Sequence, residues 1–185
     1  SLAGIGLKEN SAAAFSLGAL VSYLLETQKQ TMGHIKSFGI YQIGSRMVLD
    51  KSTIKNLEIT ETLFEKKTRG SLLGVLDKTH TAMGGRKIRN WLREPLKSCQ
   101  EICERLDAVE ALLEDEMLRN NIKESLKAIY DFERLSAKIA TGSANGKDIV
   151  ALRNSLYVLP EIKLDLKDSE SLLLNDIYRN IDTLE

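Results

Sequence analysis

The sequence predicts an all-α fold, a multi-helix bundle with several long helices and one small β-hairpin-like segment near 38–50. Two observations predict the helices. From Leu96 onward, apolar residues recur every three or four positions, which is the spacing of one helix face. Residues that commonly cap helix starts precede most of these segments. The hairpin-like segment is predicted because β-branched and aromatic residues are interrupted by glycine around Gly39 and Gly44.

The composition is that of one globular domain without a membrane span. With 185 residues the chain can bury a single core, since domains typically hold ~100–200 residues. An apolar run such as ALVSYLL at 19–25 is far shorter than the ~20 residues that cross a bilayer. Cys99 and Cys103 lie one helical turn apart, away from His34 and His80. We therefore expect helix-packing cysteines in a reducing, cytoplasmic compartment, and no metal site.

Three helices are predicted in the first part of the chain. Ser11 is a good N-cap for a helix over about 11–30, whose Ala, Leu and Glu content favours helix. Asp50 can cap a short helix through 51–59, KSTIKNLEI. After the charged turn FEKKTRG, another short helix covers 71–78.

The stretch from Val75 to Leu96, VLDKTHTAMGGRKIRNWLREPL, combines a predicted helix with features of a structural joint. Thr81 can cap this helix, and the proline should end it, because residues before proline avoid helical torsions. Glycines inside a helix cost up to ~1 kcal/mol each, so the adjacent pair suggests close backbone packing. The residues assigned to the joint are Gly84, Gly85, Trp91 and Pro95.

The same stretch carries the densest group of cations in the chain. Helical spacing places its arginines on one face. Such a face can contact DNA phosphates, although a solvated or ion-paired helix face has the same pattern. If this face contacts DNA phosphates, the cations that we expect to do so are Arg86, Lys87, Arg89 and Arg93.

The second half of the chain is predicted to be almost entirely helical. One helix should carry the apolar stripe Ile102, Leu106, Val109, Leu113 and Met117. Asp131 can cap the next helix, FERLSAKIATG. Apolar residues from Ile149 to Leu166 then form a seam of roughly 30 Å, in which Pro160 should bend the helix or start a second one. A final helix over about 170–184 has no C-cap, so we expect it to continue in a longer chain.

The two halves of the chain carry opposite charge. Residues 1–97 hold 15 Lys+Arg and 8 Asp+Glu (15 − 8 = +7), and residues 98–185 hold 11 and 18 (11 − 18 = −7). This asymmetry permits a nucleic-acid surface on the first half, but equally permits complementary contacts within the fold or with other domains.

No stretch has the pattern of a catalytic or nucleotide-binding site. GSANGKD at 142–148 has three residues between its glycines, and Asp148 stands where a phosphate-binding loop needs Ser or Thr. The histidines have no paired nucleophile motif, and the sequence contains no zinc-finger spacing, RNA-recognition signature or aromatic stacking series. We therefore expect no catalytic, cofactor-binding or metal-binding residues.

Taken together, these segments resemble the central core or lever domain of the MutS family of bacterial DNA mismatch-repair proteins. The matching segments, in chain order, are ALVSYLLETQKQTMGHI, VLDKSTIKNLEIT, GSLLGVLDKTHTAMGGRKIRNWLREPL, ERLDAVEALL, DFERLSAKIATG, KDIVALRNSL and LPEI. The most specific are the Asn-Leu-Glu pattern at 56–58 and the Gly-Arg, Trp-Leu and Pro-Leu patterns within 85–96.

The resemblance implies a division of the chain. Residues 1–8 would be the tail of a connector domain, 9–97 the first half of the core, and 98–185 lever helices that stop before a clamp domain. It also implies a longer parent protein, a homodimeric, DNA-dependent ATPase that binds mismatched duplex and works with a MutL-type repair partner. ATP and Mg would bind in the parent's ATPase domain, outside this chain.

The predicted function is mechanical. Long packed helices can carry a rigid-body displacement, so this core/lever fragment would couple the ATPase domains to the mismatch-binding and clamp domains, with no activity of its own. Two alternatives stay open: a stand-alone helical DNA-binding module that uses the basic first half, and a non-repair paralogue of the same superfamily.

Overall fold

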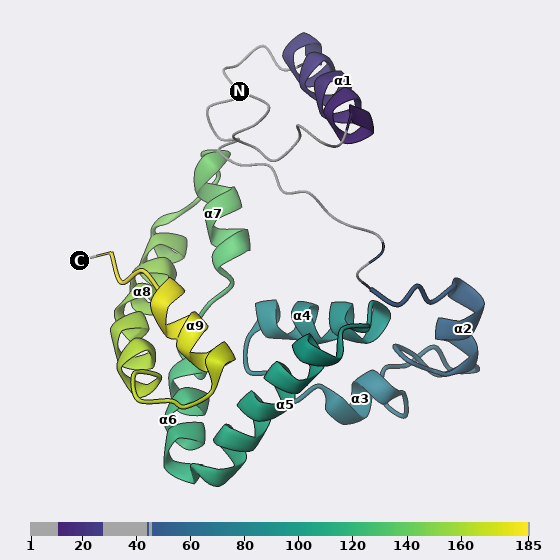
Figure 1. The fold of residues 1–185 in the computed structure, drawn as a ribbon. Coiled ribbons are helices and arrows are strands. Elements are labelled where there is room, and N and C mark those ends of the chain that lie inside the picture. Colours follow the sequence, from purple (N-terminus) through teal and green to yellow (C-terminus); the bar gives the residue numbers. More distant parts are fainter. Residues whose placement is uncertain (1–10, 28–43, 45, 185) are drawn as a thin grey trace. The chain divides into compact units, whose positions relative to one another are not determined.

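The computed structural model describes residues 11–27, 44 and 46–184, which fold mainly as helices joined by loops (Figure 1). The chain divides into two compact units, residues 1–44 and residues 45–185. In the first unit the structure describes one helix, α1 (Ser11–Thr27). As far as it is described, α1 confirms the helix predicted over 11–30.

The second unit is a series of helices, and the all-α prediction is confirmed. In chain order they are α2 (Lys51–Asn56), α3 (Leu72–Leu76), α4 (Ala82–Arg93), α5 (Cys99–Glu114), α6 (Glu116–Lys127), α7 (Phe132–Ala140), α8 (Gly146–Asp165) and α9 (Leu172–Asn180). Within the described ranges there is no strand, and Arg46 and Leu96 form an isolated antiparallel β-bridge. The hairpin-like segment near 38–50 lies mostly outside those ranges, so it stays a prediction. None of the described helices is long and apolar enough to cross a membrane.

Side-chain caps set the start of every helix from α2 to α9. A helix start leaves backbone N–H groups without partners, and a capping oxygen accepts a hydrogen bond from one of them. The caps of α2, α4 and α7 are the predicted Asp50, Thr81 and Asp131. The remaining caps are Ser71, Ser98, Asp115, Asn145 and Ser171.

The Asn-Leu-Glu pattern at 56–58 forms the turn that follows α2. Glu58 has a left-handed backbone, with φ of +48°. Its carboxylate accepts from the Leu63 N–H at 2.6 Å, and its carbonyl accepts from the Leu72 N–H at 3.0 Å. These bonds tie α2 to the start of α3, whose Leu73 is fully buried. The pattern therefore has a structural role inside the chain.

The main core lies where α5, α6, α8 and α9 meet. Its buried centre consists of Ala108, Ile162, Leu166 and Leu174. Helices α6 and α7 both pack on α8, and α5 packs on α6 and α9 (Figure 1). Of the apolar seam predicted along α8, Ile162 and Leu166 are buried, whereas Ile149 at its start is exposed. The seam therefore contributes to the core mainly through its C-terminal half.

The apolar stripe predicted for α5 does not face this core. Leu106, Val109 and Leu113 are all more than half exposed, and α5 turns Ala108 and Leu112 inward instead. The small Ala108 lets neighbouring helices approach closely, which a bulky side chain at that place would prevent. The helix also ends at Glu114, so Met117 belongs to α6 and not to the same helix. The prediction of one continuous stripe is wrong on both points.

Two helix boundaries near the C-terminus differ from those expected. Helix α8 runs through Pro160 to Asp165, so the start of a second helix at the proline is wrong, and the alternative, a bend, stays a prediction. Helix α9 ends at Asn180 with Ile181 as its C-cap, rather than running to 184. The Ile181 carbonyl accepts from Lys163 Nζ at 2.7 Å, which satisfies an oxygen that the helix end leaves without a partner.

The burial pattern predicts how two leucine substitutions will affect stability. Leu166→Ala removes a side chain that is 3% exposed, so it should lower the free energy of unfolding by about 2–5 kcal/mol. Leu106→Ala removes one that is 60% exposed and should change it by about 0.5 kcal/mol or less. Urea unfolding followed by circular dichroism measures both. If both substitutions lowered the free energy of unfolding equally, the α5 stripe, and not Ala108, would face the core.

Candidate functional site

The predicted joint begins at the N-terminal turn of α4. Thr81 Oγ1 accepts from the Gly84 N–H at 3.0 Å. A Cβ at Gly84 would lie 3.0 Å from that Oγ1 and 3.2 Å from Thr79 Cβ, which is tight, whereas a Cβ at Gly85 would meet Thr79 Oγ1 at an ordinary 3.4 Å. Gly84 therefore keeps space open for the cap, and Gly85 has room for a methyl group.

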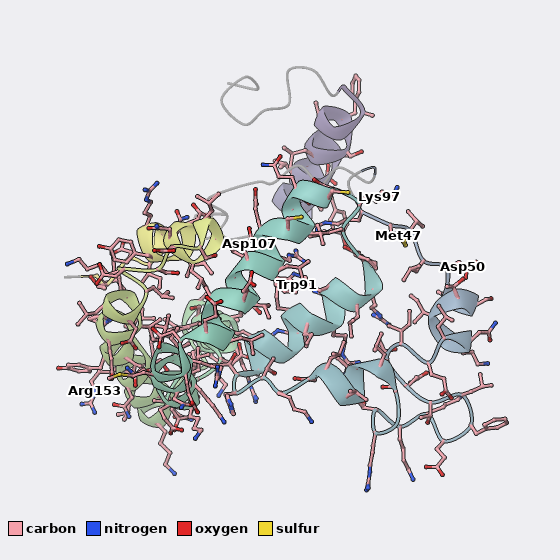
Figure 2. The ribbon with its side chains drawn as sticks, turned by 60° about the horizontal axis from the view of Figure 1, so that its bottom comes forward. Met47, Asp50, Trp91, Lys97, Asp107 and Arg153 are labelled. Carbon is pink, nitrogen blue, oxygen red and sulfur yellow. The ribbon has the colours of Figure 1, made fainter. Side chains whose placement is uncertain are left out.

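The indole ring of Trp91, on α4, connects this helix to α5 by contact with a cation, and the ring is only partly buried (Figure 2). Arg105 Cζ, on α5, lies 3.7 Å from the centroid of the indole ring, and Lys87 Nζ, on α4, lies 5.9 Å from it. Both distances are within the ~6 Å range of cation–π attraction. The indole remains 39% exposed. The pKa of Arg105 is lowered, chiefly because burial penalises its charge and also because Arg46 is nearby.

Pro95 ends α4 as predicted. Glu94 is the C-cap, and its N–H donates to the Asn90 carbonyl at 2.9 Å. The Pro95 carbonyl accepts from the Met47 N–H at 2.8 Å, and Leu96 beside it is buried. The connection between α4 and α5 therefore also holds the segment that leads into α2.

Arg86 is held by two carboxylates at the start of α7. Its Nη1 donates to Asp131 Oδ2 at 2.7 Å, and its Nη2 donates to Asp131 Oδ1 at 2.9 Å and to Glu133 Oε2 at 2.6 Å. A bidentate arginine–carboxylate pair is both strong and directional. The hydrogen bond from Arg86 lowers the pKa of Asp131 to about 2. Arg86 therefore links α4 to α7, and phosphate contact by its guanidinium would require breaking these bonds.

The other three cations assigned to phosphate contact lie on the exposed surface of α4. Lys87, Arg89 and Arg93 are all exposed. Arg89 lies near Asp77, whose pKa is lowered mainly by hydrogen bonds from Thr79. Within the described residues, none of the three makes an ion pair shorter than 4 Å. Their guanidinium and ammonium groups are therefore open to an anion.

The link from α7 to α8 consists of short polar bonds around Ser155. This side chain is fully buried; its Oγ accepts from the Tyr130 N–H at 2.9 Å and donates to the Ala151 carbonyl at 2.9 Å. In the first turn of α8, Asp148 Oδ1 accepts from Lys138 Nζ of α7 at 2.7 Å. These bonds fix the linker before α7 and the C-terminal part of α7 to the same face of α8.

The GSANGKD stretch forms the start of α8. Asn145 caps the helix by accepting from the Asp148 N–H at 3.1 Å, and the Asp148 carboxylate accepts from the Asn145 N–H at 3.0 Å. These reciprocal bonds make a capping box. The bond from the Asn145 N–H to the carboxylate lowers the pKa of Asp148, with a further contribution from Lys138. Glycine and aspartate at these positions therefore serve a helix start.

Several residues of this region were not predicted as functional. The partners of Arg86, the stack of Arg105 on Trp91, and the bond of Ser155 to Tyr130 join segments that are distant in sequence. The structural role of Gly74 was also not predicted. A Cβ at this position would overlap with the Thr68 carbonyl oxygen. No local pattern distinguishes these partners from other charged, polar or small residues on helices.

The described residues offer little reactive chemistry. They contain no group of three or more His, Cys, Asp or Glu side chains placed to hold a metal ion. Cys99 and Cys103 are free and exposed, so the prediction that they pack between helices is wrong. The side chains around α4 link this helix to α5 and to the start of α7, and three of its cations are exposed.

Comparison with known proteins identifies similar sequences over the whole chain. The family model for MutS domain III matches residues 52–184. The chain is 52% identical to the DNA mismatch repair protein MutS of Alkaliphilus oremlandii, over 98% of this chain and 21% of that protein. It is 46% identical to the protein of the same name from Alkaliphilus metalliredigens, over 100% and 21%, and 43% identical to that of Halothermothrix orenii, over 100% and 20%. The chain thus spans about a fifth of the length of these relatives.

The ion pair between α4 and α7 predicts a specific pH dependence. Arg86→Gln should raise the pKa of Asp131 from about 2 toward 3.8, though not fully, because the Arg134 N–H still donates to it. A carboxylate with a lowered folded-state pKa stabilises the fold above its unfolded pKa, and this stabilisation is lost as pH falls through the folded value. Wild type should therefore exceed the variant in free energy of unfolding above about pH 4 and lose this advantage by about pH 2.

Two measurements check this expectation. Carboxylate titration by NMR gives the pKa of Asp131, and urea unfolding between pH 6 and about 2 gives the difference in free energy. Arg153→Gln is the matched control, because Arg153 bonds only to the Asn154 amide oxygen and to no carboxylate in the described residues. An Asp131 pKa that does not change in Arg86→Gln would rule out the pair as the cause of the lowered value.

Proposed function

The chain belongs to the MutS family, through domain III of these proteins, and from this premise we propose that it couples movements of the other domains mechanically. The relatives are named DNA mismatch repair proteins. We propose the same role for the longer protein: a homodimer that binds mismatched duplex DNA, with ATP and Mg bound outside this chain and a MutL-type partner. The chain would then connect ATP binding to DNA binding without hydrolysing ATP or reading the mismatch itself.

One observation carries this proposal: specific bonds connect α4 to α8 through α7. Arg86 holds α4 to the first turn of α7, and Ser155 holds the linker before α7 to α8. Lys138 adds a second link between α7 and α8. Directional bonds of this kind resist sliding, so a displacement of α4 would be passed on to a helix of 20 residues, which is ~30 Å long.

The stand-alone DNA-binding module finds no support in the comparisons. The relatives are about five times longer than the matched region, which makes this chain one segment of a larger assembly. The sequence patterns of this chain also form bonds within the fold. The helix caps, the turn formed by the Asn-Leu-Glu pattern and the GSANGKD stretch all have structural roles.

Breaking the link between α4 and α7 should weaken coupling in the longer protein. Arg86→Gln is expected to slow ATP-triggered release from mismatched DNA by about 2–30-fold, the range that corresponds to a coupling loss of ~0.5–2 kcal/mol. ATP hydrolysis without DNA should stay near the wild-type rate, because the ion pairs of Arg86 with described residues are all at the start of α7. Stopped-flow fluorescence of a labelled duplex measures the release, and Arg153→Gln is the control. Wild-type release by Arg86→Gln would contradict the coupling role of this pair.

A second proposal is that Lys87, Arg89 and Arg93 contact DNA phosphates. It is supported by their exposure on α4 and by the lack of a close carboxylate partner among the described residues. Arg86 is left out of this surface because Asp131 and Glu133 occupy its guanidinium. Phosphate contact would be independent of sequence and of the mismatch.

The salt dependence of DNA binding tests this second proposal. Each lost phosphate contact lowers the slope of log K against log salt by about 0.9 on B-DNA. Arg89→Gln and Arg93→Gln should each do so in fluorescence anisotropy titrations of the chain with a labelled duplex, equally with and without a mismatch. Arg153→Gln should leave the slope unchanged. Unchanged slopes for both variants would remove α4 from the DNA surface.

A further inference from the structure

Helix α5 begins with a pair of thiols on one side of the helix. Cys99 is the first residue of α5, and Cys103 lies one turn further along, between Lys97 and Asp107 (Figure 2). Both cysteines are free and exposed. Ala108, through which α5 packs on its neighbours, follows Cys99 by nine positions, which places it on the opposite side of the helix. The two thiols therefore take no part in the core.

The spacing of the thiols disfavours a direct bond between them. Side chains four residues apart on a helix have Cβ atoms about 5–6 Å apart, whereas a disulfide needs Cβ atoms about 3.5–4.5 Å apart. A disulfide between Cys99 and Cys103 would therefore distort the first turn of α5. A longer bridge between the two sulfur atoms would leave the helix as it is.

A metal ion supplies a bridge of suitable length. Thiolates are strong ligands for soft metal ions. Two metal–sulfur bonds of about 2.3 Å each can join sulfur atoms up to ~4.6 Å apart, whereas the S–S bond spans only about 2 Å. An ion between Cys99 and Cys103 can thus bind both thiolates while α5 keeps its geometry.

The number of ligands selects the kind of ion. The described residues contain no group of three or more His, Cys, Asp or Glu side chains placed to hold a metal ion. Structural zinc and iron–sulfur clusters take about four such ligands, so a pair of thiols does not suit them. Copper(I) is also selected by soft thiolates, and this monovalent ion accepts two ligands in a linear arrangement.

We propose that Cys99 and Cys103 form a two-thiolate site that binds one copper(I) ion. Binding breaks two S–H bonds, forms two Cu–S bonds and releases two protons to the solvent; copper keeps its oxidation state. Residues 98–185 carry a net charge of −7 (11 − 18), which attracts a cation. Both ligands belong to one helix, so the site is complete within this chain and is independent of the mechanical role proposed above.

Competition for copper(I) tests the proposal. The chain is titrated without oxygen against the chromophoric chelator bicinchoninate, and any binding can be assigned because these two are its only cysteines. The expected result is one ion per chain. Cys99→Ser and Cys103→Ser should each weaken binding by about 100-fold or more, because joining two ligands raises affinity by about 10²–10⁴.

A relocated pair of thiols is the matched control. Cys99→Ser with Glu101→Cys keeps two thiols, and Glu101 is exposed, but residues two apart on a helix do not face each other. This variant should bind copper(I) as weakly as the single variants, while circular dichroism shows unchanged helix content. Equal affinity in the relocated pair, wild-type affinity in either single variant, or a copper-linked dimer in sedimentation velocity would each overturn the proposal.

Discussion

The pairing of Arg86 with Asp131 and Glu133 is the interaction on which the arrangement of this chain most depends. Among the ion pairs that the structure describes, only these join the basic first half to the acidic second half. Asp131 has two tasks at once, because it also caps α7 by accepting from the Arg134 N–H. One carboxylate therefore takes part both in the start of α7 and in the link from α7 to α4.

The rest of the second unit extends this link by similar means. At each helix start from α2 to α9 a side chain satisfies backbone groups that the helix exposes, as Asn145 and Asp148 do at α8, and Lys163 does so at the end of α9. Ser155 does so across helices, by accepting from the Tyr130 N–H while fully buried. A buried hydroxyl with both bonds made is costly to displace. Bonds of this kind add directional links between short helices to the apolar packing of the core.

The sequence predicted what depends on neighbours in the chain. The caps Asp50, Thr81 and Asp131, and the end of α4 before Pro95, follow from local rules of helix geometry and were confirmed. Which face of α5 is buried could not be predicted in this way, because the neighbouring helices pack against the small Ala108 rather than against the larger leucines of the predicted stripe. The partners of Arg86 lie 45 and 47 residues away, and any of the exposed acids satisfies the same pattern. The family resemblance predicted which domain this chain forms, but only the structure showed which of its cations form ion pairs.

The opposite charges of the two halves divide into those that bond within the fold and those that stay exposed. Complementary contacts within the fold account for one cation of α4, Arg86, while Lys87, Arg89 and Arg93 remain exposed. On the acidic side, Glu110 and Glu114 border an apolar face that the described helices leave uncovered. These exposed charges are therefore available to partners. A surface that is electrically divided in this way can attract and orient partners of either charge.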